Sequence, residues 1–102
     1  MAKPLKYDLK DFKVLKGART GDKRIAYVFK SRDNVVEANL FWEPSNVEMR
    51  LIIWDNKTGN IIGQRGIAYP LVNYRGGGVL PKPDVFINSL IRVLARGDYE
   101  GV

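Results

Sequence analysis

The chain has 102 residues, and its 17 Lys and Arg against 11 Asp and Glu give a formal charge of +6. This length fits one domain, residues 1–102, and the charge is typical of proteins that attract DNA, RNA, acidic membrane surfaces or acidic proteins. Ordinary solubilising charge is the alternative interpretation. Cys and His are both absent, which excludes disulfides, thiolate zinc sites and catalysis by a Cys–His or Ser–His pair.

Residues 1–23 form a Lys-rich N-terminal segment without the apolar run of a secretory signal. Its apolar residues fit both a helical stripe and a short strand, and we favour a strand near Phe12–Lys16 that ends at Gly17. No stretch is long enough to span a membrane. We therefore expect a soluble protein of the cytoplasm, or of the host-cell cytoplasm if the protein is viral.

Four segments with alternating side chains follow, at 24–31, 35–43, 47–55 and 60–69. Alternation of this kind predicts strands of an antiparallel sheet with one face packed and one face bare. Gly59 lies in the turn between the last two segments, where it can take the positive φ that a tight hairpin requires.

Residues 70–83 break the pattern with Pro and Gly and predict a loop, and residues 84–96 predict an amphipathic helix. Pro83 and Asp84 suit the start of this helix, and Gly97 suits the position after its end. The sequence thus predicts an α+β fold: a four- or five-stranded antiparallel sheet with one C-terminal amphipathic helix packed on one face.

Evidence for an enzyme is weak, and we expect none, with no cofactor, no metal site and no small-molecule substrate. Glu43 and Glu48 flank one turn, so a metal-dependent nuclease is a minor alternative, but solvated surface charge explains this pair better. Residues 76–78 are three glycines, yet the Lys-Ser/Thr step of a phosphate-binding loop does not follow them.

The strongest functional signal is the alternation of basic and aromatic residues along the strands. Single-stranded nucleic acid is bound by this combination, because cations contact phosphates and flat rings stack on bases. Since one helix covers only one face of the sheet, Phe41, Trp54, Arg50 and Arg65 are expected to share the bare face. The candidate contacts are Lys30, Arg32, Arg50, Lys57, Arg65, Arg75, Trp54, Phe41 and Tyr74.

Three stretches, 36–42, 48–54 and 64–69, together with the predicted helix, resemble the single-stranded-DNA-binding transcriptional coactivator family (positive cofactor four and its bacterial and phage relatives). Trp54 matches a Trp near the end of that family's third strand, and Arg65-Gly66-Ile67 matches its Lys/Arg-Gly-Ile/Val step before the helix. The resemblance covers residues 24–96. The loop over 70–81 departs from it, because the family passes almost directly into the helix.

The resemblance implies four strands and a helix, a homodimer formed through the helices, and binding of single strands or melted duplex along the sheet. Such a protein would assist transcription or replication. The rival hypothesis is a small viral or phage accessory protein that acts as a protein–protein interaction module, with its exposed aromatic residues as binding anchors.

Overall fold

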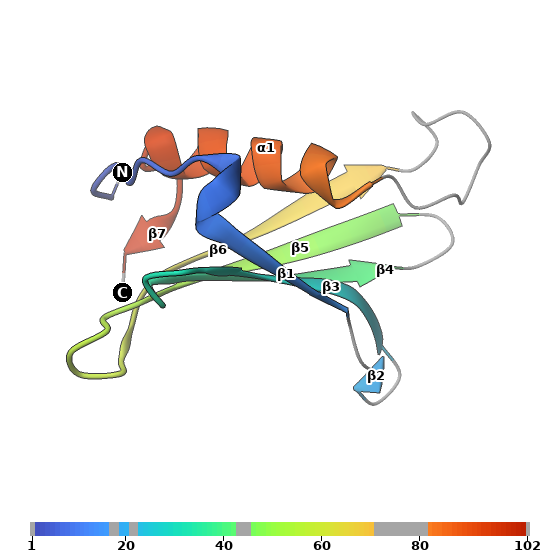
Figure 1. Cartoon of the computed structure of the whole chain (residues 1–102), viewed down its shortest axis with the longest axis horizontal. Helices are drawn as coiled ribbons and strands as arrows, with labels where there is room; N and C mark the ends of the chain where they lie inside the picture. The colour runs from blue at the N-terminus through green and yellow to red at the C-terminus, as the bar shows by residue number, and fades with distance from the viewer. Residues whose placement is uncertain (1, 17–18, 21–22, 43–45, 71–81, 102) are drawn as a thin grey trace.

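A computed structural model describes residues 2–16, 19–20, 23–42, 46–70 and 82–101. Within these ranges seven strands form one antiparallel sheet, with the order β1-β3-β4-β5-β6-β7 and with β2 paired to β3 beside this path (Figure 1). The helix α1 (Pro83–Ala95) lies across one face of the sheet. The predicted α+β architecture is confirmed, but the sheet has more strands than the expected four or five.

The strands are β1 (Phe12–Lys16), β2 (Arg19–Thr20), β3 (Lys23–Ser31), β4 (Val36–Trp42), β5 (Asn46–Trp54), β6 (Ile61–Pro70) and β7 (Glu100–Gly101), and the 3-10 turn η1 (Leu9–Asp11) precedes β1. Five of them match predicted segments to within one or two residues. The sequence did not predict β2 and β7, because two residues are too few to show an alternation. Of the predicted loop over 70–83, residues 71–81 lie outside the described part of the chain.

The core lies between α1 and the sheet. Alternate residues of β4 and β5 point toward the helix and are buried, while Phe86, Ile87, Leu90 and Leu94 form the buried face of α1. The core members of the two strands are Val36, Ala38, Leu40, Val47, Met49, Leu51 and Ile53. Full burial of each large aliphatic side chain contributes about 1.5–3 kcal/mol, so this layer supplies most of the driving force for folding.

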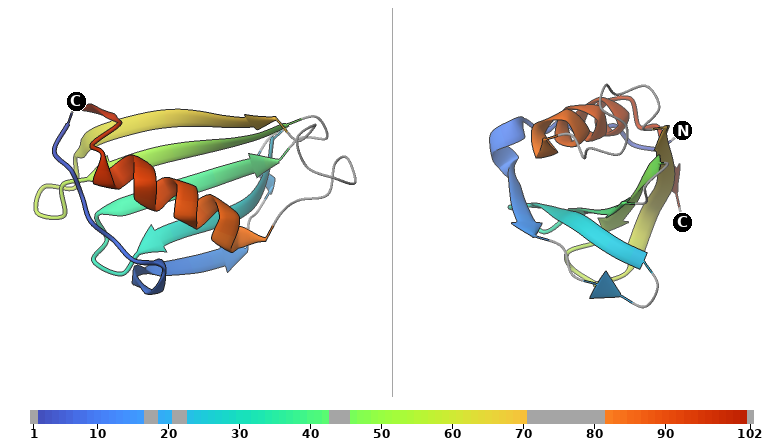
Figure 2. Two further views of the ribbon diagram at one scale, coloured as in Figure 1. Left: turned by 90° about the horizontal axis from the view of Figure 1, so that it is seen from above. Right: turned by 90° about the vertical axis from the view of Figure 1, so that its right-hand side faces the viewer.

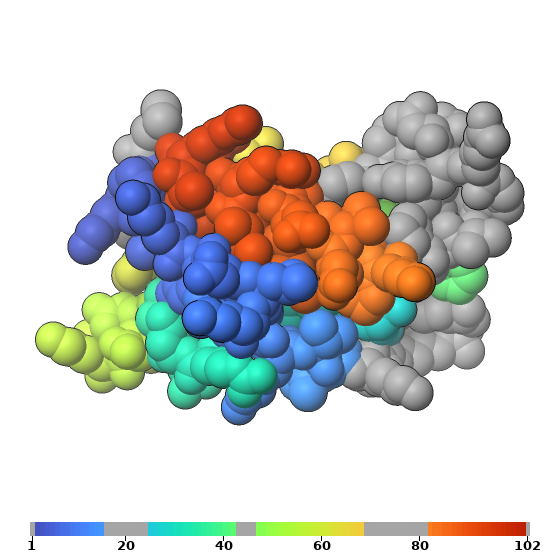
Figure 3. Space-filling view, turned by 45° about the horizontal axis from the view of Figure 1, so that its top comes forward, coloured from blue at the N-terminus to red at the C-terminus, as the bar shows by residue number. Residues whose placement is uncertain are grey.

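The N-terminal segment packs along one side of α1 (Figure 3). The backbone N–H of Leu5 donates to the carbonyl of Leu94 at 2.8 Å, and that of Ala2 donates to the carbonyl of Gly97 at 3.1 Å. Gly97 has φ +64° directly after the helix, which is the left-handed conformation that ends many helices. The N-terminus is therefore tied to the C-terminal end of α1.

A polar cluster fixes the β3–β4 turn to this segment. Tyr7 Oη donates to Asp33 Oδ2 at 2.8 Å, and Ser31 Oγ donates to Asp33 Oδ1 at 2.5 Å. Burial alone would raise the pKa of Asp33, but hydrogen bonds from Ser31, Tyr7 and the Val35 backbone outweigh it and hold this pKa below its ordinary value of 3.8. Burial is the main cause that raises the pKa of Tyr7, and the hydrogen bond to Asp33 raises this pKa further.

Candidate nucleic-acid interface

The face of the sheet opposite α1 is not covered by any element of the described chain (Figure 2). We call it the open face. The strand register assigns to it the side chains that alternate with the core residues, because cross-strand partners point to the same side. They are Lys13, Leu15, Ile25, Val28, Lys30, Glu37, Asn39, Phe41, Glu48, Arg50, Ile52, Trp54, Ile61, Gln64, Gly66 and Ala68.

Arg50 and Phe41 form the centre of the open face. Arg50 lies opposite Asn39, and Phe41 lies opposite Glu48, so the two residues are diagonal neighbours on β5 and β4. The Cζ atom of Arg50 is 5.7 Å from the centroid of the Phe41 ring, within the range of a cation–π interaction. The ring is half-buried and Arg50 is exposed, so a guanidinium and an aromatic ring reach solvent together.

A second group of cations lies across β1 and β3. Lys13 pairs directly with Lys30 in the antiparallel register, and like charges in this position repel each other. Lys30 also approaches Glu37 of β4, with Nζ 3.5 Å from Oε1, so one of the two positive charges is balanced within the group. Lys13 was absent from the predicted contacts, because only the register shows that it faces Lys30.

Trp54 lies at one end of the open face, half-buried. It lines a hollow of about 500 Å³ together with Lys30, Glu37 and residues of the two adjoining turns. The indole ring and the Lys30 ammonium thus border the same surface depression. The cation that borders this depression beside Trp54 is thus Lys30, and neither Arg50 nor Arg65 lines it.

Arg65 does not share the open face, and the prediction that it lies beside Arg50 is wrong. It pairs with the buried residue Leu51, so it points to the helix side of the sheet. Its Nη1 lies 2.5 Å from Asp98 Oδ2 and donates to the Asp98 carbonyl at 2.9 Å. The alternation of side chains along β6 divided the strand correctly into two faces. Because apolar residues occur on both faces, the sequence did not show which face packs toward the helix.

The other predicted contacts lie away from the centre of the open face. Arg32 is in the β3–β4 turn, where its Nε donates to the carbonyl of Lys10 at 3.0 Å, and this bond helps to hold η1. Lys57 is exposed in the β5–β6 turn. Tyr74 and Arg75 lie outside the described residues, as does Glu43 of the proposed acidic pair.

One corner of the sheet brings further basic residues together. In the β2–β3 pairing Arg19 lies opposite Arg24, and Thr20 lies opposite Lys23. Figure 1 shows β2 on the side of the sheet away from α1. The backbone therefore places this basic hairpin next to the open face.

Within the described ranges no group of three or more Asp or Glu side chains could hold a metal ion, and no helix is long and apolar enough to cross a membrane. Comparisons with family models, with curated proteins and with solved structures find no match to this chain. The resemblance to the coactivator family and the homodimer that it implies stay predictions.

Proposed function

We propose that this protein binds single-stranded nucleic acid, DNA or RNA, on the open face of its sheet, without catalysing a reaction. One observation carries the proposal: the Arg50 guanidinium lies over the Phe41 ring on a face that no described element covers. Cationic groups contact the phosphate backbone, and exposed rings stack on bases that a single strand leaves free.

The arrangement of the cations supports a polyanionic ligand. The repulsion between Lys13 and Lys30 is relieved when a phosphate lies between them, because each ammonium then gains an opposite charge. Arg50 supplies planar N–H groups that match phosphate oxygens while its flat surface remains on the ring.

The open face also carries two acidic residues. Glu37 is paired with Lys30, whereas Glu48 lies on β5 directly opposite Phe41. The rows of side chains that run through Lys30 and through Arg50 both lie to one side of the row that contains Phe41 and Glu48. We expect the phosphates of a bound strand to follow these two rows.

The experiment measures the anisotropy of a fluorescein-labelled oligothymidine over a series of salt concentrations. The logarithm of the binding constant should fall with the logarithm of salt concentration by about 0.7 for each phosphate contact. Arg50→Gln should weaken binding and reduce this slope by about one contact. Arg92→Gln is the matched control, because Arg92 is exposed on α1, on the other side of the sheet.

Equal loss of affinity in the Arg50 and Arg92 variants would show that only the net charge attracts the oligonucleotide, and it would contradict the assignment to the open face. Salt-independent binding, or no binding by the wild-type chain, would contradict nucleic-acid binding itself.

A further inference from the structure

The two edges of the sheet differ in how they are protected. The β1 edge carries Lys13, and charged residues on edge strands prevent pairing with other chains. At the other edge β7 pairs only with Gly63 and Gln64 of β6, while β6 continues to Pro70. The left view of Figure 2 shows β6 as the outermost strand over most of its length. Residues 65–70 therefore form an edge that no described strand covers; the charged residue of this edge, Arg65, is held by Asp98, and Pro70 lies at the end of the strand.

This edge has an unused set of backbone groups. In an antiparallel pair every second residue directs its N–H and C=O toward the neighbouring strand, and the residues between them direct theirs away. Since β5 occupies one side of 65–70, the outward groups are available to an added strand. Many recognition modules bind extended peptides in this way.

Gly66 gives a second, independent indication. A Cβ atom at Gly63 would lie 2.7 Å from the Tyr99 ring, so packing within the fold requires that glycine. A Cβ atom at Gly66 would meet only Glu48 Oε1, at 3.9 Å, and no positive φ occurs there. The fold itself gives no reason for glycine at this position. Glycine within a strand often marks a place where a ligand or another backbone approaches closely.

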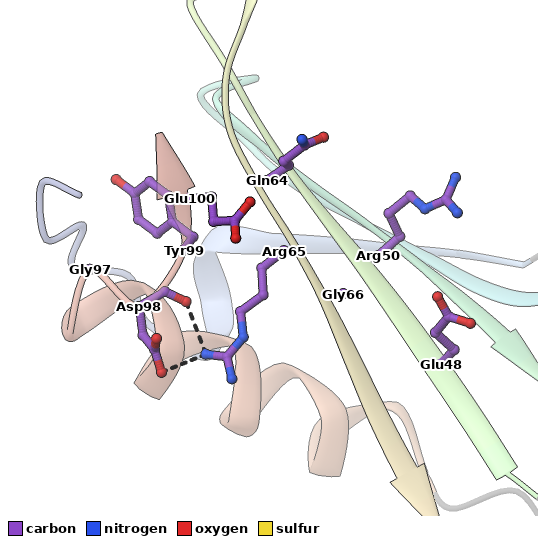
Figure 4. Close-up of a pocket in the computed structure, with 9 residues that line it drawn as sticks. All are labelled: Glu48, Arg50, Gln64, Arg65, Gly66, Gly97, Asp98, Tyr99 and Glu100. Carbon is purple, nitrogen blue, oxygen red and sulfur yellow. Dashed lines mark hydrogen bonds and ion pairs between the residues drawn. The ribbon is translucent and has the colours of Figure 1, made fainter. Parts of the chain in front are cut away.

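The charge beside this edge is negative in a chain that is positive overall. A groove of about 690 Å³ follows the edge (Figure 4), and Glu48, Arg50, Arg65, Asp98 and Glu100 are its charged residues. Arg65 is paired with Asp98, and Arg50 leans toward Phe41 of β4. Within the described part of the chain this leaves Glu48 and Glu100 without an ion pair, and the Glu48 carboxylate reaches over Gly66.

We propose that an extended segment of a partner protein adds to β6 at residues 65–70 and places a Lys or Arg side chain over Gly66, against Glu48. The side chain opposite Gly66 in the added strand points to the open face, as Gly66 does. The missing side chain at this position opens the route to the carboxylate. The peptide backbone occupies the edge of the sheet, whereas the oligonucleotide is placed on its face, and only the peptide's Lys or Arg side chain reaches the open face, where Arg50 is the strand partner of Gly66.

The test uses the full chain and a fluorescein-labelled peptide of alternating Thr and Val with one central Lys. Two further versions carry N-methyl groups on one or the other set of alternate amides. Strand addition predicts that one N-methylated version fails to bind and the other binds as the parent does. A peptide with Glu in place of Lys should bind at least tenfold more weakly. Equal binding of both N-methylated peptides would overturn the proposal.

Variants of the protein locate the peptide. Gly66→Thr should melt at the same temperature as the wild type or higher, because Thr suits a strand better than Gly, and should lose at least tenfold in peptide affinity. Glu48→Gln should remove the preference for Lys over Glu. Asn39→Thr, at the centre of the open face, is the control and should bind the peptide normally. A different outcome is that the wild type forms a dimer and does not bind the peptide, while Gly66→Thr is a monomer. In that case a second copy of this chain occupies the edge, and the proposal is wrong.

Discussion

The guanidinium of Arg50 lies over the ring of Phe41, with Cζ 5.7 Å from the ring centroid, on the face of the sheet that α1 leaves bare. This contact holds the guanidinium of Arg50, a β5 residue, over the neighbouring strand β4. One nucleotide can therefore stack its base on the ring and contact the guanidinium with its phosphate.

Phe41→Leu should weaken the binding of oligothymidine by about 1–3 kcal/mol, the contribution of stacking on one base. The thermal unfolding temperature should change little, because Phe41 is half-buried and lies outside the core cluster. Anisotropy titrations and thermal melts on the same samples check the two expectations. A large fall in melting temperature with unchanged affinity would assign Phe41 a structural role.

Oligonucleotide binding should quench the tryptophan fluorescence, and Trp54 should be the source. Trp54 follows Ile52 on the open face, whereas Trp42 is packed against the core on the helix side. Trp54→Phe should therefore remove the quenching while keeping the residual emission of Trp42. If the quenching survives in this variant, the oligonucleotide does not approach Trp54.

Arg65→Gln should leave oligonucleotide affinity unchanged, because Arg65 points to the helix side and is paired with Asp98. Its effect on the free energy of unfolding should be small, about 0–1 kcal/mol, as for other partly exposed ion pairs. Parallel titrations of the Arg65 and Arg50 variants compare the same change of charge on opposite sides of one sheet. A loss in the Arg65 variant as large as in the Arg50 variant would contradict the assignment to the open face.

Asp33 should make the fold sensitive to acid. Its pKa is lower in the folded chain than its ordinary value of 3.8. The stability that it contributes is therefore fully present above that value and is lost as the pH falls through the lower folded pKa. Urea unfolding at neutral and acidic pH should show this loss in the wild type, and Asp33→Asn should reduce it. An unchanged acid dependence in the variant would assign the effect to other carboxylates.

Gly97→Ala should destabilise the fold by about 1–3 kcal/mol, because a side chain at φ +64° is strained there. The added Cβ would also overlap the carbonyl oxygen of Ala2 and push the N-terminal segment from α1. Urea unfolding measures the loss. Gly59→Ala is a useful comparison, since it carries a similar strain with nothing within 4 Å of its Cβ.

Sequence reasoning predicted the parts of the fold that depend on periodicity. The alternation of Val36, Ala38 and Leu40 and the apolar stripe of α1 placed the core correctly, because burial on one face imposes these periods. It could not place β7, where Tyr99 is buried against Gly63 through a contact between residues far apart in the chain. It also predicted no role for 98–101, which show no repeating pattern.

The candidate site was predicted only in part, for a related reason. Arg50, Phe41 and Trp54 were assigned to one bare face from alternation, and the strand register agrees. Arg65 was misassigned because β6 is only half covered by the core and its two faces are similar in polarity. The pairing of Lys13 with Lys30 depends on a register between β1 and β3, which no local pattern of the sequence records.

Photocrosslinking tests the central claim most directly. An oligonucleotide with 5-bromouracil in place of thymine is irradiated with the wild-type chain, and mass spectrometry of the digest identifies the attached residue. Binding on the open face predicts adducts on Phe41 or Trp54, which disappear when unlabelled oligothymidine competes. Adducts confined to α1 or to the N-terminal segment that packs beside it would contradict the proposal.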